Sequence, residues 1–484
     1  MAVTEPPKAS IRTTGPWQQL GVILAALIAF AWYGTVLLRR AEALQSRAFD
    51  QAFFQQLAWN IGHGHGFVTN FAPGNALAVH FSPFLALVAI PDLLWTDPRM
   101  LSLLNAAGLA AAGPAAFLFL RTLLPDAPLG RALALATGVS LPFWPAIQEA
   151  ARSDFHPESL ALPIALLAAT AGLSGRRRTF WILALTTLSI KEDQVYTLVV
   201  VGLVVASRNG SLKADGRRLI AVAIAWGVAV FIVVMPLLAL LSAPPGQAQL
   251  LTASYYGWIA HSNPGAVISA FLRPEAWERL GVLLLCVGAL PVLRPRWAVL
   301  ILPPFLADLM SSHYPQMILH FHYGLLLIVP TVSAAGMGAA WLLHGSQNRR
   351  PEAGPLGAWP ALAVLPLGLL AGILLGGMPP ALGSSNPPPT TSSALLQLQR
   401  CALAIPAGSA VAADDNLGPP LASRQRLVEI TSARPTDYVA VDVQAAPPGW
   451  IDLEARRAIL AGLPHQRLLA CSDGPIQIWA PSAT

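Results

Sequence analysis

The residues able to do chemistry lie in a few polar segments of an otherwise apolar chain. These segments are FDQAFFQQLAW with Asp50, HFSP with His80, RSDFHPE with Arg152, Asp154, His156 and Glu158, KED with Lys191, Glu192 and Asp193, and HFHY with His320, His322 and Tyr323. Carboxylates and imidazoles act as general bases or as ligands of a cation. An ionisable residue at membrane depth is costly, so each such residue is a candidate for function.

The triplet Lys191–Asp193 is the clearest of these candidates. It separates two apolar runs, 179–190 and 194–207, of only about a dozen residues each. At about 1.5 Å per residue, runs that start at the cytoplasmic face would end below the outer surface. We therefore expect the triplet to lie at membrane depth. A helix hairpin closed by an internal ion pair is the alternative.

Two further segments have a specific chemical interpretation. Asp154, His156 and Glu158 precede the apolar run 159–174 and have the side chains of metal ligands or of a general base, with a polar turn and a helix N-cap as the alternative. His320 and His322 are two residues apart, so on a helix they point to different faces. At most one of them is expected to face a shared cavity.

The composition determines which kind of scaffold holds these residues. Of 484 residues, 55% are hydrophobic and 11% are charged, whereas a typical soluble domain has about 25% charged residues. A soluble protein of this composition would expose far too much apolar surface. We therefore predict an all-α multi-pass membrane protein of the cell membrane. No basic run indicates a nucleic-acid partner.

Apolar runs predict about eleven membrane crossings. The runs cover residues 17–38, 100–120, 131–148, 159–174, 179–190, 194–207, 219–241, 279–293, 297–310, 317–341 and 357–378. If the further run 80–95 does not cross, 15 of the 23 Lys and Arg in residues 1–380 fall in cytoplasmic segments, in agreement with the positive-inside rule. We therefore expect a cytoplasmic segment 1–16 and a transmembrane domain 17–378, with a long first outer loop 39–99 that holds 80–95 at the interface.

The outer side is where this topology places most acidic residues. The cytoplasmic loops hold four carboxylates, and the outer side up to residue 380 holds the other 12. Near the start of the first outer loop, Asp50 lies among aromatic and aliphatic residues in the stretch 49–59. This pattern predicts an amphipathic helix that lies in the membrane interface.

The C-terminal part of the chain has a different pattern. Residues 379–393 predict a linker rich in Pro, Ser and Thr, and residues 394–484 predict a small extracytoplasmic α/β domain. Its expected strands are 409–413, 437–443 and two near 467–480, and its expected helix is 452–462. Cys401 and Cys471 both fall in this domain, where an extracytoplasmic location permits a disulfide. The sequence leaves their pairing open.

In order and spacing, the polar segments resemble a bacterial and archaeal multi-pass family catalogued as domain of unknown function 2079. The resemblance rests on FDQAFFQQLAW, GHGHGF, HFSP, DFHPE, KED and HY. It covers about residues 45–345, with weaker matches in the tail. That family is similar in layout to the C-type glycosyltransferases (GT-C). These membrane enzymes carry an acid in a long first outer loop and typically use polyprenyl-phosphate sugars on the extracytoplasmic side.

The resemblance implies a catalytic site on the outer face, with the bilayer and a lipid-linked sugar as partners. It places Asp50 at the first-loop acid and Asp154 at a second acid. An inverting transfer needs a base at the acceptor hydroxyl and cations at the departing phosphate. Substrate and phosphate contacts are then expected from Arg152, His80, Lys191, Glu192, Asp193, His322 and Tyr323. A divalent cation, Mg²⁺ or Mn²⁺, is expected at Asp50, Asp154, His156 and Glu158.

Two functions other than glycosyl transfer remain open from the sequence. A transporter or flippase would use Lys191–Asp193 and His322 as a proton or substrate path. A scaffold without catalysis would bind a protein partner that the sequence does not identify. Convergence of Asp50, Asp154 and Lys191 in one outward-facing cavity would favour the enzyme, whereas a polar path through the bilayer would favour the transporter and scattered residues the scaffold.

Overall fold

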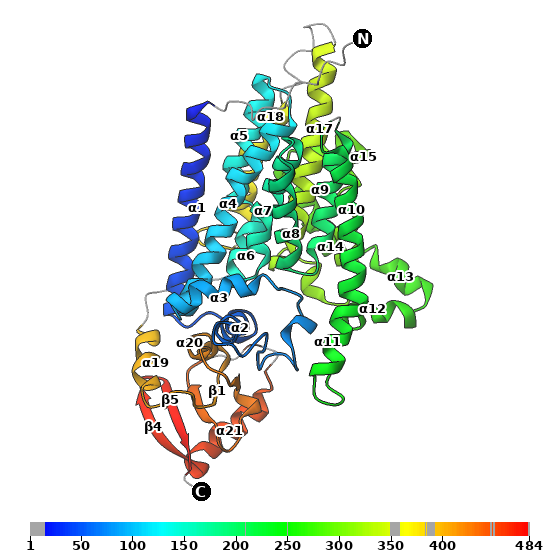
Figure 1. Ribbon diagram of the computed structural model, residues 1–484. Coiled ribbons are helices and arrows are strands. Elements are labelled where there is room, and N and C mark those ends of the chain that lie inside the picture. The colour runs from blue at the N-terminus through cyan, green and yellow to red at the C-terminus, as the bar shows by residue number, and fades with distance from the viewer. Residues whose placement is uncertain are drawn as a thin grey trace.

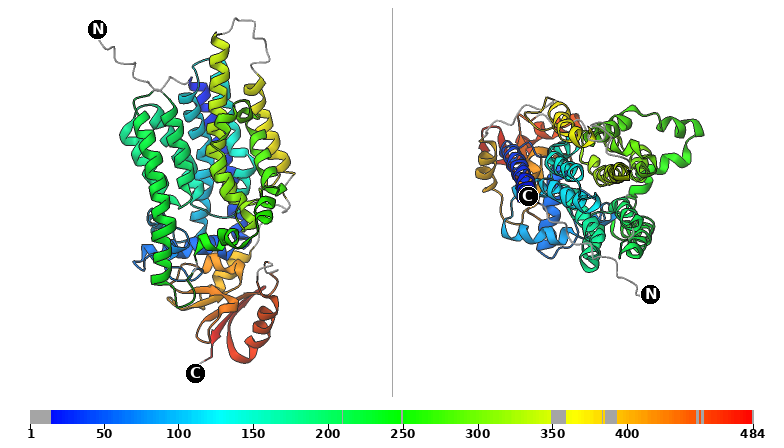
Figure 2. Two further views of the ribbon diagram at one scale, coloured as in Figure 1. Left: turned by 90° about the vertical axis from the view of Figure 1, so that its right-hand side faces the viewer. Right: turned by 90° about the horizontal axis from the view of Figure 1, so that it is seen from above.

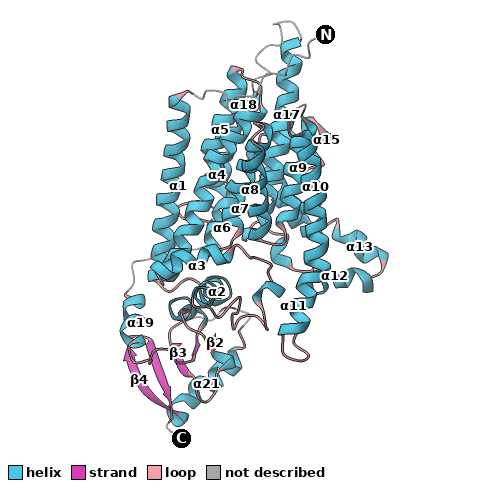
Figure 3. Ribbon diagram, viewed as in Figure 1, coloured by secondary structure: helices cyan, strands magenta, loops and turns pink. Residues whose placement is uncertain are grey.

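The protein is a helical bundle with a small sheet-containing domain at one end (Figures 1 and 3). The computed structural model describes residues 15–208, 210–248, 250–348, 359–382, 384, 393–445, 448 and 451–482. Most of the predicted N-terminal segment 1–16 and of the predicted linker 379–393 lies outside these residues. The chain is an integral membrane protein with multiple spans, as predicted, and its orientation in the membrane remains a prediction.

The bundle helices follow the predicted apolar runs. They are α1 (Pro16–Glu42), α4 (Pro98–Leu123), α5 (Pro128–Ser140), α6 (Pro145–Arg152), α7 (Glu158–Leu173), α8 (Arg177–Ile190), α9 (Gln194–Ser207), α10 (Lys213–Val228), α11 (Met235–Ser242), α14 (Pro274–Cys286), α15 (Pro295–Ala298), α16 (Leu302–Leu309), α17 (Ile328–Asn348) and α18 (Trp359–Leu375). Among the described residues, four segments are long and apolar enough to cross a membrane, namely Pro16–Glu42, Pro98–Leu123, Lys213–Ser242 and His322–Leu343. The number of crossings, about eleven, remains a prediction.

Small residues let the central helices approach closely. A side chain at Gly108 of α4 would meet the backbone oxygen of Ser159 in α7 at 2.6 Å, and one at Gly113 would meet the backbone oxygen of Gly138 in α5 at 2.5 Å. Such contacts are typical of helices packed in a membrane, where small residues allow the backbones to touch. On the outside of the bundle, α1 and the segment Lys213–Ser242 expose large apolar side chains, as lipid-facing helices do.

The first loop lies across the end of the bundle that carries the sheet-containing domain, which we call the domain end. Its helix α3 (Leu85–Leu94) lies across the long helices there (Figure 1). It is only ten residues long and exposes Leu87, Ile90 and Leu94. The position of residues 80–95 along the membrane interface remains a prediction.

The stretch around Asp50 differs from the sequence prediction. It forms a π-helical turn, η1 (Ala48–Ala52), followed by α2 (Phe53–Gly62). Both the aromatic side and the glutamine side of α2 are buried, because α2 lies between the bundle and the C-terminal domain (Figure 1). The prediction of an amphipathic interfacial helix is therefore wrong, because Gln55 and Gln56 are buried and bond to Asp92 and to the Arg424 backbone.

Two further helices extend the bundle sideways at the domain end. They are α12 (Leu251–His261) and α13 (Pro264–Ala270), which project away from the long helices in the view along the bundle (Figure 2). The N-terminal end of α12 contributes residues to the cavity described below.

The C-terminal domain contains the predicted strands and helix. Its elements are α19 (Ala394–Ala402), β1 (Val411–Ala413), α20 (Gly418–Leu421), β2 (Leu427–Glu429), β3 (Tyr438–Asp442), α21 (Leu453–Gln466), β4 (Arg467–Asp473) and β5 (Ile476–Pro481). The sheet has the order β2-β1-β3-β5-β4, with β1 parallel to both β2 and β3, and with β5 antiparallel to β3 and β4. The small mixed domain is thus confirmed, and β2 is an additional strand.

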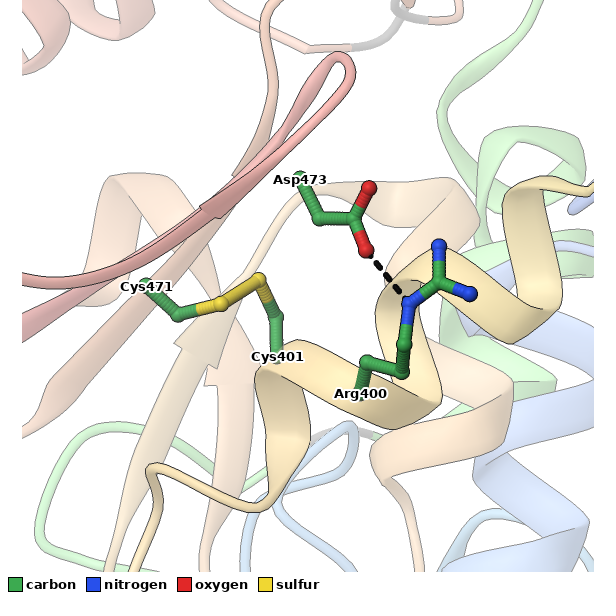
Figure 4. Close-up of a disulfide and its surroundings, with 4 residues drawn as sticks. All are labelled: Arg400, Cys401, Cys471 and Asp473. Carbon is green, nitrogen blue, oxygen red and sulfur yellow. Dashed lines mark hydrogen bonds and ion pairs between the residues drawn. A yellow bond between two sulfur atoms is a disulfide. The ribbon is translucent and has the colours of Figure 1, made fainter.

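A disulfide closes this domain. Cys401 of α19 and Cys471 of β4 are bonded (Figure 4), and the remaining cysteine, Cys286, is buried in the bundle. The bridge links residues 70 positions apart. It therefore removes many conformations from the unfolded chain, and it joins the helix that follows the linker to the last hairpin.

Replacing Cys401 with Ser is expected to destabilise the C-terminal domain by about 2–4 kcal/mol, because the closed loop is long. Limited proteolysis of the purified membrane protein should then cleave residues 394–482 faster than in the wild type. The double variant Cys401→Ser/Cys471→Ser should behave like the single one. Equal cleavage rates in wild type and variants would show that the bridge adds nothing to the domain.

Candidate functional site

The Lys191–Asp193 turn between α8 and α9 is held by the HFSP segment of the first loop. Ser82 Oγ donates to the backbone oxygen of Ile190 at 2.7 Å, and the backbone N–H of Phe81 donates to Glu192 Oε2 at 2.9 Å. His80 Nδ1 lies 3.1 Å from the other carboxylate oxygen of Glu192. Two segments more than 100 residues apart therefore form one wall of the site, with Glu192 as its anchor.

Lys191 is buried between two carboxylates. Its side chain is 6% exposed and bonds to Glu158 Oε1, and its Nζ lies 3.3 Å from Asp193 Oδ2. The same Nζ lies 5.9 Å from the centre of the Tyr323 ring. Two acidic partners therefore already balance this single positive charge.

A cavity of about 240 Å³ opens beside this ion pair. It is lined by His80, Glu158, Lys191, Glu192, Asp193, Tyr196, Phe231, Leu251, Thr252, Tyr255, Tyr256, Ala307, Asp308, Gln316, His322, Tyr323 and Leu326. Of the two histidines, only His322 lines the cavity; His320 precedes the helical turn that begins at His322, so their predicted separation by helix faces does not apply. The site therefore brings six of the seven predicted substrate and phosphate residues to one cavity.

A line of side chains connects Asp50 to this cavity. Asp50 Oδ1 lies 3.4 Å from His156 Nε2, and the His156 ring stacks on the His322 ring with centres 3.4 Å apart. His322 Nε2 lies 3.8 Å from Glu158 Oε1. The Asp50 side chain is 42% exposed. Asp50 is thus accessible but lies two contacts away from the cavity wall, so Asp50 and Lys191 do not converge in one cavity.

Asp154 has a different position from that predicted. Its carboxylate accepts the backbone N–H of Arg47 at 3.0 Å, and its backbone has a left-handed φ of 63°, which aspartate tolerates better than most residues. Burial raises the pKa of Asp154 above its usual value. The positive charge of Arg40 offsets part of this rise, and the negative charge of Asp50 adds to it. Asp154 therefore holds the start of the first loop and does not line the cavity.

Arg152 also lies outside the cavity lining. Its Nε and Nη2 donate to Glu149 Oε2 at 3.0 and 2.9 Å, and Nη2 donates to the backbone oxygen of His320 at 3.3 Å. Its side chain is 22% exposed. The guanidinium is thus partly accessible at the domain end, with a single acidic partner among the described contacts.

The residues predicted to hold a divalent cation do not gather into one site. Asp154 bonds to the Arg47 backbone and Glu158 to Lys191, which leaves Asp50 and His156 as a pair. Among the described residues, no group of three or more His, Cys, Asp or Glu side chains is placed to hold a metal ion. As placed, these donors do not fit the predicted cation.

All residues of this site lie in the part of the chain that matches a known family model. A family model described as "Predicted membrane protein (DUF2079)" matches residues 40–463. The chain belongs to the DUF2079 family. This membership confirms the resemblance found in the polar segments, and the matched range includes the bundle, the first loop and most of the C-terminal domain.

Comparison with other proteins adds a structural likeness. This DUF2079 protein is similar to ArnT from Cupriavidus metallidurans, whose crystal structure is bound to undecaprenyl phosphate, with a TM-score of 0.49 and 14% sequence identity. The match covers 96% of this chain and 98% of that chain. A likeness at this level assigns neither activity nor ligand. No curated protein sequence matches the chain.

Some residues of the DUF2079 site were missed by the sequence analysis. Asp308 lines the cavity and accepts from Nη2 of the fully buried Arg279 at 2.8 Å. Tyr196, Tyr255 and Tyr256 form aromatic walls. The charges of Arg279 and Asp308 within otherwise apolar runs were the available signal, because an intramembrane charge indicates function.

The C-terminal domain is hydrogen-bonded to the loop that bears Asp50. Buried Asp415 accepts from the backbone N–H of Ala48 and from Arg47 Nη1, both at 3.1 Å. Gly418 packs closely against the same loop, because a Cβ there would lie 3.0 Å from that of Ala48. The position of Asp50 therefore depends on a domain more than 360 residues further along the chain.

Replacing Asp415 with Ala is expected to loosen residues 44–52, because a charged acceptor of two hydrogen bonds is lost, at about 1.5–3 kcal/mol for each. Hydrogen exchange measured by mass spectrometry should show faster exchange in this segment. The control is Asp473→Ala, which removes an ion pair with Arg400 at the disulfide (Figure 4). Identical exchange of residues 44–52 in Asp415→Ala and wild type would show that Asp415 does not hold this loop in place.

Proposed function

We propose that this protein is an integral-membrane glycosyltransferase that uses a polyprenyl-phosphate-linked sugar on the extracytoplasmic side. The observation that carries the proposal is the place of Asp50. It is an accessible carboxylate on the first loop, at the domain end, two contacts from a polar cavity. The resemblance to GT-C enzymes, which carry an acid in a long first outer loop, supports the same role.

The proposed reaction assigns the base to Asp50. Its carboxylate takes the proton of the acceptor hydroxyl while that oxygen bonds to the anomeric carbon of the donor. The bond between the anomeric carbon and the phosphate oxygen breaks, and polyprenyl phosphate leaves with the electron pair. His156, 3.4 Å from Asp50, orients the carboxylate. The acceptor approaches from the exposed side of Asp50.

The departing phosphate needs a cation that it can reach. Arg152 suits this role better than Lys191, because it is partly exposed and has one acidic partner whereas Lys191 is buried with two. In the proposal, Arg152 binds the phosphate at the domain end. Lys191 instead keeps the carboxylates of the cavity in place.

A deletion strain separates this proposal from a scaffold, whereas sugar transfer by the purified protein separates it from a transporter. The enzyme predicts that the strain accumulates a polyprenyl-phosphate sugar and loses one glycan modification, as lipid and glycan profiling would show. Wild-type protein should reverse both changes, and Asp50→Asn should reverse neither. Asp126→Asn, an exposed carboxylate outside the first loop, should complement fully. Full complementation by Asp50→Asn would refute the enzyme proposal.

A further inference from the structure

The cavity beside Lys191 is lined by more carboxylates than the one positive charge in its lining can balance. Among the described residues that line it are four carboxylates, those of Glu158, Glu192, Asp193 and Asp308, against the one ammonium group of Lys191. Arg279 balances Asp308 from outside the lining. A phosphate placed here would meet this acidic lining in a poorly solvated space, which is unfavourable.

Polar atoms of the lining lack partners within the protein. Glu158 Oε2, Gln316 Oε1 and His322 Nδ1 are buried atoms with no hydrogen-bond partner among the described residues. Glu158 and His322 are themselves only 5% and 6% exposed. Leaving such groups unpaired costs about 1–3 kcal/mol each, so a ligand or ordered water that donates hydrogen bonds is expected to satisfy the two oxygens.

The remaining walls are aromatic. Tyr196, Tyr255, Tyr256 and Tyr323 face the same space. Its volume of about 240 Å³ is below the roughly 300–1,000 Å³ of sites for drug-sized ligands. A single ring with apolar faces and a rim of hydroxyl donors matches this combination of aromatic walls, acceptor oxygens and size.

We infer that the cavity is the binding site for the sugar ring of the substrate and excludes its phosphate. The inference rests on the proposed function and deepens it, since it divides the donor between two places. The uncharged, hydroxyl-rich ring binds between the tyrosines and donates hydrogen bonds to Glu158 and Gln316. The phosphate stays outside the cavity, at the domain end.

Saturation-transfer NMR on the full-length protein in nanodiscs tests the inference without a transfer reaction. The probes are neutral monosaccharides (glucose, galactose, mannose and arabinose) and undecaprenyl phosphate without a sugar. At least one monosaccharide should bind the wild type, and adding undecaprenyl phosphate should not displace that monosaccharide. Absence of binding by all four, or displacement of the sugar by the phosphate lipid, would overturn the inference.

Two variants locate the binding. Gln316→Leu removes the unpartnered oxygen without touching an ion pair, and Tyr256→Leu removes an aromatic wall. Each should weaken sugar binding about tenfold. Tyr314→Leu changes an exposed tyrosine outside the lining and should have no effect. Binding that survives both cavity variants in folded protein would place the sugar elsewhere. Sugar binding by a protein that shows no transfer would refute the proposed function but not this site.

Discussion

Asp50→Asn is expected to lower the rate of sugar transfer by about 10²–10⁴-fold, the usual contribution of a general base. Asparagine has nearly the same shape as aspartate, so it can remain next to His156, but it cannot accept the proton of the acceptor hydroxyl. The measurement is the initial rate of transfer in proteoliposomes at saturating donor.

The fold should survive this substitution, because the Asp50 side chain is 42% exposed and its ion-pair partner is a single histidine. The melting temperature of purified Asp50→Asn should equal that of the wild type. Since Asp154 is buried against the Arg47 backbone, Asp154→Asn should lose stability as well as rate. A rate for folded Asp50→Asn within a factor of two of the wild type would remove Asp50 from the chemistry.

Lys191→Met is expected to destabilise the protein by about 3–5 kcal/mol, the cost of breaking a buried ion pair from one side. The substitution leaves Glu158 and Asp193 facing one another without their shared cation. Thermal unfolding of the purified protein in nanodiscs should show a melting temperature several degrees lower.

A second variant tests whether the cost comes from the unpaired charge. Glu158→Gln/Lys191→Met removes both charges of the closest pair and should recover part of the loss. Arg178→Met removes an exposed positive charge near the start of α8 and should leave the melting temperature unchanged. If the double variant unfolded no later than Lys191→Met, the pairing would not be the source of the stability.

Much of the scaffold was predictable because it depends on local patterns. Apolar runs gave the helices, and the break at Lys191–Asp193 gave a buried polar turn, since charges between two short runs cannot reach the surface. In the tail, short apolar segments predicted four of the strands. The short strand β2 (Leu427–Glu429) was missed.

What the sequence did not predict depends on contacts between distant residues. The glutamines of α2 look solvent-facing on a helix, but Gln56 donates to the backbone of Arg424, 368 residues away. The pairing of Lys191 with Glu158 likewise joins two segments that the sequence analysis assigned to separate roles. Asp154 was predicted as a second catalytic acid from the resemblance to GT-C enzymes, and its hydrogen bond to the Arg47 backbone, 107 residues away, was not predictable from the sequence.

The central claim is that this protein moves a sugar from a polyprenyl phosphate to an acceptor. The most direct test is a reconstituted assay in which the protein, in proteoliposomes, receives radiolabelled polyprenyl-phosphate sugars and a membrane extract as the source of acceptor. We expect the wild type to convert one of these donors to polyprenyl phosphate with the label on an acceptor, and folded Asp50→Asn not to do so. Label that stays on the donor lipid with folded wild-type protein, or that leaves it equally fast with Asp50→Asn, would contradict glycosyl transfer at Asp50.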